Sequence, residues 1–139
     1  MKMIFVSFMM ILLLAGCVSG DSNTGSYEEN IHVLDERFFA MQVMEIFQNQ
    51  DDFLGRTIRY EGIFRSFYLP MAGGDIFIVY RYIDGCCGPE PAGLQVYLND
   101  IEPFPDDTWV EVTGVFTRVE GDERSTLLLD VISLVEKIN

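Results

Sequence analysis

Residues 56–67 read RTIRYEGIFRSF, and this stretch decides the fold. Ile58, Tyr60, Gly62 and Phe64 alternate with charged residues on the other side, and a period of two is typical of a β-strand with one buried face. Gly62 interrupts the row of large side chains in the middle of the strand. A glycine at this place predicts a bulge or a sharp bend, which a small barrel needs.

Four further stretches have the composition of strands and are separated by segments rich in Gly, Pro and acidic residues: 76–83, 93–98, 108–118 and 125–135. The first is apolar on both faces, as in a central strand. The third carries Gly114 in its middle, so it repeats the signal of residues 56–67. No internal repeat and no second domain is visible.

A single helix precedes these strands. Asp35 is a good N-cap, and Phe39, Val43, Ile46 and Phe47 then recur at helical spacing as far as residues 49–52. The neighbouring side chains Phe38, Met41 and Met44 are expected to widen the apolar face toward the core. Residues 31–34 are a short strand or an extended lead-in. The prediction is a mainly β fold with one N-terminal helix (α+β), built as a small five-stranded Greek-key barrel of the oligonucleotide/oligosaccharide-binding (OB) type, with a half-open β-sandwich as the alternative.

The first 17 residues have the pattern of an export signal. Lys2 is followed by an apolar run over residues 4–14, which is too short for a stable membrane span. It ends in Leu-Ala-Gly-Cys at residues 14–17, which resembles the bacterial lipoprotein signal motif. That resemblance implies cleavage before Cys17 and lipidation of its sulfur. The expected location is the extracytoplasmic face of the cell membrane, with the lipid as anchor.

Residues 18–30 are polar and rich in Gly and Ser, as in a flexible tether with a reach of about 20 Å. The expected organisation is therefore a lipoprotein signal peptide at 1–17, a tether at 18–30 and an OB-like domain at 31–139. The formal net charge of −13 argues against a nucleic-acid partner, because binding to phosphates needs a basic surface.

Three segments resemble one bacterial family in order and spacing: 53–64, 77–87 and 107–114. They are similar to its Gly-containing first strand, its strand ending in Cys-Cys and its Asp-x-Trp-Val strand. The family is the DUF1980 group of YcgQ-like proteins, whose members carry N-terminal membrane helices before an OB-like module. The resemblance implies a barrel fold and work beside a membrane permease. This chain has Gly88-Pro89-Glu90 where the family pattern has Ala-Asp-Ala, so Glu90 is the nearest substitute for its acidic position.

The adjacent cysteines Cys86 and Cys87 are the candidate site, because they are the two thiols that remain after lipidation of Cys17. Thiolates bind zinc and other thiophilic metals, and His32, Asp84 or Glu90 are the candidates to complete the shell. The two cysteines alone are a weak metal signal, since a closed zinc site has four ligands.

Two other interpretations of the pair stay open. In the first, the pair is a redox-active vicinal dithiol. Its disulfide would be strained, because adjacent Cα atoms are about 3.8 Å apart. In the second, one thiol packs in the barrel and the other has no role. Arg81 and Tyr82, just before the cysteines, are candidate binding residues, and Tyr60, Tyr80 and Tyr82 are candidates to stack a base or a sugar.

The acidic residues of the 99–107 loop match no calcium loop, and a solvated surface is the expectation there. No nucleophile–base pair or phosphate loop is visible. The resulting hypothesis is a non-enzymatic, lipid-anchored accessory or binding protein. A thiol–disulfide redox protein and a structural interaction module are the alternatives.

Overall fold

The computed structural model describes residues 30–121 and 125–138. The predicted signal peptide with Cys17, and the tether up to residue 29, lie outside the described residues. Within the described ranges, no helix has the length and apolar character needed to cross a membrane.

Ten elements follow one another along the chain. They are β1 (Ile31–Val33), η2 (Glu36–Phe38), α1 (Phe39–Gln48), α2 (Gln50–Phe53), β2 (Thr57–Leu69), η3 (Pro70–Ala72), β3 (Gly74–Gly85), β4 (Gly88–Tyr97), β5 (Trp109–Glu120) and β6 (Ser125–Glu136).

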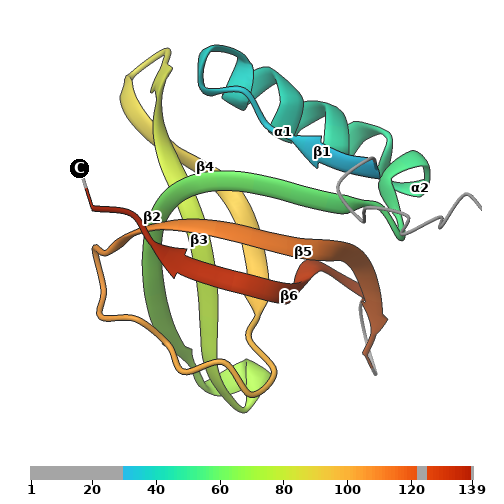
Figure 1. Ribbon diagram of the computed structural model, residues 1–139, viewed down its shortest axis with the longest axis vertical. Helices are drawn as coiled ribbons and strands as arrows, with labels where there is room; N and C mark the ends of the chain where they lie inside the picture. The colour runs from blue at the N-terminus through green and yellow to red at the C-terminus, as the bar shows by residue number, and fades with distance from the viewer. Residues whose placement is uncertain (1–29, 122–124, 139) are drawn as a thin grey trace, which may run out of the picture.

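Five strands close into a barrel, in the order β2-β3-β4-β6-β5, and the pairing of β5 with β2 completes the ring (Figure 1). All neighbours are antiparallel except β4 and β6, which run parallel. The short strand β1 adds to β2 in parallel. The predicted α+β class and the small OB-like barrel are therefore confirmed, and the closed ring excludes the half-open sandwich.

The helix begins as predicted and packs more narrowly than predicted. The Asp35 carboxylate accepts a hydrogen bond of 2.8 Å from the Arg37 backbone N–H, as an N-cap does. Phe39, Val43 and Ile46 are buried in the core. The prediction of a wider apolar face toward the core is wrong, because Phe38, Met41 and Met44 are each more than half exposed. In Figure 1, α1 crosses one end of the barrel, so only one stripe of it contacts the strands.

Strand β2 changes partner in its middle, and Gly62 makes the change possible. Residues 57–63 pair with β5, whereas residues 63–69 pair with β3. A Cβ atom on Gly62 would lie 2.7 Å from the Tyr80 carbonyl oxygen, so any other residue would push β3 away. Gly114 of β5 also lies at an interruption of regular pairing, because the register of β5 with β6 shifts between Thr113 and Gly114. Gly114 therefore lies at an irregularity, as the sequence predicted, whereas Gly62 lies where β2 changes partner.

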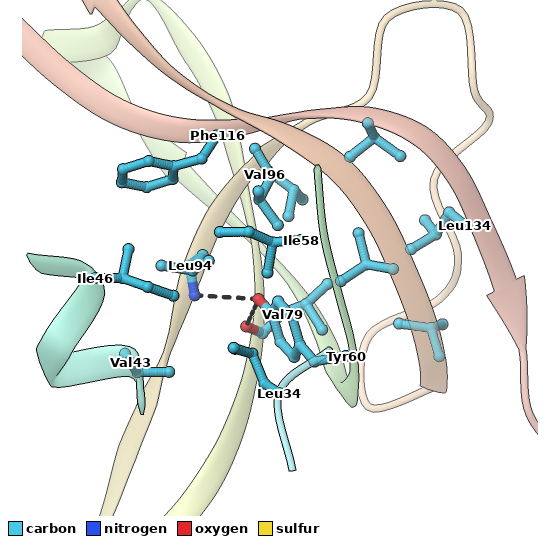
Figure 2. Close-up of a cluster of buried hydrophobic side chains, with 14 of the residues drawn as sticks. Leu34, Val43, Ile46, Ile58, Tyr60, Val79, Leu94, Val96, Phe116 and Leu134 are labelled. Atoms are coloured by element: carbon cyan, nitrogen blue, oxygen red, sulfur yellow. Dashed lines mark hydrogen bonds between the residues drawn. The ribbon is translucent and has the colours of Figure 1, made fainter. Parts of the chain in front are cut away.

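The Tyr60 side chain points into the core and connects three strands. Its hydroxyl donates a hydrogen bond of 2.7 Å to the Val79 carbonyl of β3 and accepts one of 3.2 Å from the Leu94 N–H of β4 (Figure 2). Burial raises the pKa of the Tyr60 phenol well above its ordinary value, because the ionised form would lose its solvation in the core. Because this side chain is buried, the prediction that Tyr60 stacks a ligand is wrong.

Strand β4 begins earlier than the sequence indicated, at Gly88 instead of Gly93. Residues 85 and 88 already pair, so β3 and β4 form one long hairpin with a two-residue turn. Prolines 89 and 91 do not prevent this, because nitrogens two residues apart face the same edge of a strand. That edge of β4 meets β6 only at Val96 and Tyr97.

We expect Tyr60→Phe to lower the free energy of unfolding by about 1–3 kcal/mol, because the Leu94 N–H and the Val79 carbonyl lose a buried partner. The stability that Tyr60 contributes through its raised pKa is present below pH 10 and declines above it. Urea unfolding of the two proteins at neutral pH and at pH 11 measures both effects.

Tyr97→Phe is the matched control, because the Tyr97 side chain is 57% exposed. We expect this variant to unfold within about 0.5 kcal/mol of the wild type. Equal losses in the two variants would contradict the role assigned to the buried hydroxyl.

Candidate functional site

The two cysteines form the turn of the β3–β4 hairpin, and their sulfurs converge. Cys86 and Cys87 lie between the paired residues Gly85 and Gly88, and Gly88 has a φ of +125°, a conformation that disfavours a side chain. The Cys86 Sγ and Cys87 Sγ atoms are 3.4 Å apart. Both side chains are exposed and form no disulfide, so neither packs in the barrel. A structural role for one buried thiol is therefore wrong.

Two carboxylates lie near the thiols. Asp84 is the last exposed side chain of β3 before the turn, and Glu90 is exposed at the start of β4. The Glu90 side chain covers the Cα atom of Gly85, where a Cβ would overlap its carboxylate. The tip thus combines two exposed thiols with two exposed acids.

His32 lies apart from this tip. It belongs to β1 and packs edge-to-face on Phe53 of α2, with 5.4 Å between ring centroids. In Figure 1, β1 starts near α2, whereas the hairpin tip projects near the opposite end of α1. Across residues 30–121 and 125–138, no group of three or more His, Cys, Asp or Glu side chains is placed to hold a metal. Among the residues that the structure describes, Cys86 and Cys87 come together and no third ligand joins them.

Arg81 holds the root of the hairpin on the barrel. Its guanidinium lies 5.5 Å from the centroid of the Phe39 ring and 5.1 Å from that of Trp109, and it pairs with Glu36 at 3.0 Å. The side chain is only 15% exposed. The sequence suggested a binding role for Arg81, and these contacts give it a structural one. The sequence did not reveal these contacts, because the aromatic partners Phe39 and Trp109 come from α1 and β5.

Tyr82 is the one candidate stacking residue of the sequence that is exposed, at 58%. It meets Tyr80 edge-to-face with 5.4 Å between ring centroids, whereas Tyr80 is buried. Burial is the main cause that raises the pKa of Tyr80. Tyr82 and Asp84 also line a pocket of about 270 Å³ between the hairpin and the start of α1. An exposed ring therefore lies on the same hairpin as the thiols.

The acidic loop before β5 is partly tied to the barrel. Asp106 accepts hydrogen bonds from the backbone N–H (2.8 Å) and the hydroxyl (2.9 Å) of Ser66, which lower the pKa of its carboxyl. Asp107 pairs with Arg65. The sequence expectation of a purely solvated surface missed these two contacts, which fasten the loop to β2.

We expect Arg81→Ala to lower the free energy of unfolding by about 1–2 kcal/mol, from the loss of two cation–π contacts and one ion pair. Arg81→Lys should recover only part of this, since an ammonium lacks the planar guanidinium. Thermal or urea unfolding compares the stability of the wild type, Arg81→Lys and Arg81→Ala, which we expect to decrease in that order.

Arg37→Ala is the control, because Arg37 is 84% exposed and its ion pair with Asp35 is 3.8 Å long. Its unfolding should stay within about 0.5 kcal/mol of wild type. Unchanged stability in Arg81→Ala would contradict the structural role of Arg81 and leave it a candidate for binding.

Comparison with curated proteins and with solved structures found no match. The family model of the DUF1980 C-terminal domain matches residues 19–138, which includes all ten elements of the fold. The resemblance noted in the three sequence segments is thereby confirmed over most of the chain. The chain belongs to the DUF1980 C-terminal domain family.

Proposed function

We propose that this protein is a lipid-anchored accessory protein on the extracytoplasmic face of the membrane, and that its β3–β4 hairpin binds a thiophilic metal ion, such as zinc, through Cys86 and Cys87. The observation that carries the proposal is the pair of exposed sulfurs 3.4 Å apart. In this role the protein delivers or receives the ion beside a membrane permease, as the family resemblance implies. The Leu-Ala-Gly-Cys motif at 14–17 supports the anchor.

The sulfur geometry favours metal binding over disulfide chemistry. Two sulfurs in near contact on one side of a turn need little movement to share an ion, because zinc–sulfur bonds are about 2.3 Å long. A disulfide would require the same atoms to close to about 2.05 Å within a strained ring of adjacent residues. Thiol–disulfide exchange is therefore the second candidate.

The metal proposal predicts that the processed chain, kept reduced, binds zinc. In Cys86→Ser/Cys87→Ser the affinity should fall by more than about 100-fold, beyond the loss typical of changes outside the coordination shell. Competition with a chromogenic chelator measures the affinity, and elemental analysis measures the bound metal.

Asp100→Asn/Glu102→Gln is the control for nonspecific binding to acidic groups, because both residues lie in the loop before β5 and keep the thiols intact. This variant should bind zinc as the wild type does. Equal zinc in the wild type and in the double serine variant would exclude the thiol site. Reversible oxidation of the pair in a glutathione buffer, without metal binding, would favour the redox candidate.

The anchor predicts that the mature chain is found in the membrane fraction with its acyl groups on residue 17. The acyl chains hold it there because each buried methylene contributes about 0.8 kcal/mol. We expect Cys17→Ser to lose the acyl mass, and thiol titration of the mature wild type to find two free thiols per chain, from Cys86 and Cys87. A mature chain without acyl groups, or one with three free thiols, contradicts the anchor.

A further inference from the structure

The distance between the two thiols indicates the coordination geometry that the hairpin favours. With metal–sulfur bonds of about 2.3 Å, two thiolates of a tetrahedral site lie about 3.8 Å apart, and those of a linear two-coordinate site about 4.6 Å. The observed 3.4 Å is closer to the tetrahedral value. A closed tetrahedral site has four protein ligands, so the turn supplies half of one.

The described part of the chain does not supply the other half. No His, Cys, Asp or Glu side chain there joins the thiols in a group of three or more. His32 packs on Phe53, and Glu90 covers Gly85. Under the proposed function, the sulfur of Cys17 carries the lipid and is no longer a thiolate. Because the described residues do not supply the two missing ligands, we consider another molecule as their source.

We propose that two copies of this chain share one divalent thiophilic ion, and that each copy contributes Cys86 and Cys87 to a four-thiolate site on a two-fold axis. The inference rests on the proposed metal binding. A two-fold axis brings identical surfaces together, so a half site on one copy becomes a whole site in the pair. A second copy offers the same donor set, at the same spacing, without any further partner.

The shape of the tip allows this approach. The hairpin projects past the barrel beside the start of α1, so two tips can meet before two barrels collide (Figure 1). The turn is flanked by Gly85 and Gly88, which carry no side chains. A Cβ atom on Gly88 would meet no heavy atom within 4 Å, so the chain leaves open space on that side of the sulfurs.

The charge of the tip makes the pairing depend on the ion. Each copy brings the exposed carboxylates of Asp84 and Glu90, and the whole chain has a formal charge of −13. Two such tips repel each other in the absence of a cation. The bonds from the ion to four thiolates outweigh that repulsion, so removal of the ion should separate the copies.

Cobalt(II) is the probe, because its absorption reports tetrahedral thiolate coordination. Titration of the reduced, processed chain in detergent should reach its endpoint at half an ion per chain. Native mass spectrometry with substoichiometric cobalt should show two chains with one ion, and excess EDTA should return them to single chains. Cys86→Ser/Cys87→Ser in the same detergent gives the baseline for chance occupation of one micelle by two chains.

Asp84→Asn/Glu90→Gln separates the shared site from a site within one chain. A shared four-thiolate site keeps its endpoint at half an ion per chain in this variant, and the pairing should tighten as the repulsion falls. An endpoint of one ion on a single chain overturns the shared site and leaves the proposed metal binding intact. No cobalt binding at all overturns the proposed function itself, and pairing that survives EDTA also overturns the shared site.

Discussion

The structure depends on how closely β3 approaches its two neighbours at Val79 and Tyr80. Gly62 of β2 and Gly93 of β4 both lie against this point, and a Cβ atom on either one would collide with the β3 backbone. The Tyr60 hydroxyl bonds Val79 and Leu94 inside the barrel at the same level. Two missing side chains and one buried hydroxyl therefore fix the place where β3 and β4 leave the barrel wall together.

The same constraint positions the candidate site. Beyond Tyr80, β3 has no pairing with β2, because β2 has turned toward β5 and carries β1 on its free edge. The hairpin continues alone with β4 as its partner, and Arg81 fastens its root between Phe39 and Trp109. The thiols thus lie at the end of an extension that is rigid at its base and open to solvent at its tip. A rigid base suits ion binding, since less chain entropy is lost when the ligands are fixed.

Local patterns predicted most of the fold. The alternation around Tyr60 and the two mid-strand glycines were sufficient for the barrel strands, and Asp35 marked the start of the helix. The sequence could not show that residues 88–92 continue the sheet, because prolines usually end strands. Only the pairing with β3 shows that the two proline nitrogens face the unpaired edge of β4. The sequence pattern also overestimated the buried face of α1, since periodicity does not tell how wide a stripe the barrel covers.

The site was predicted in part. The cysteine pair stood out in the sequence, and the structure adds that its two sulfurs lie 3.4 Å apart. The sequence could not show whether His32 lies near the cysteines, because the two are far apart in the chain. The structure places His32 on the parallel strand β1, away from the tip. The prolines of β4 have a further consequence. A projecting hairpin with a free edge invites strand addition by other chains, but prolines 89 and 91 leave that edge without two amide donors, and Glu90 places a charge between them. The β4 edge of the exposed tip is therefore protected from edge-to-edge aggregation, while the two sulfurs stay accessible.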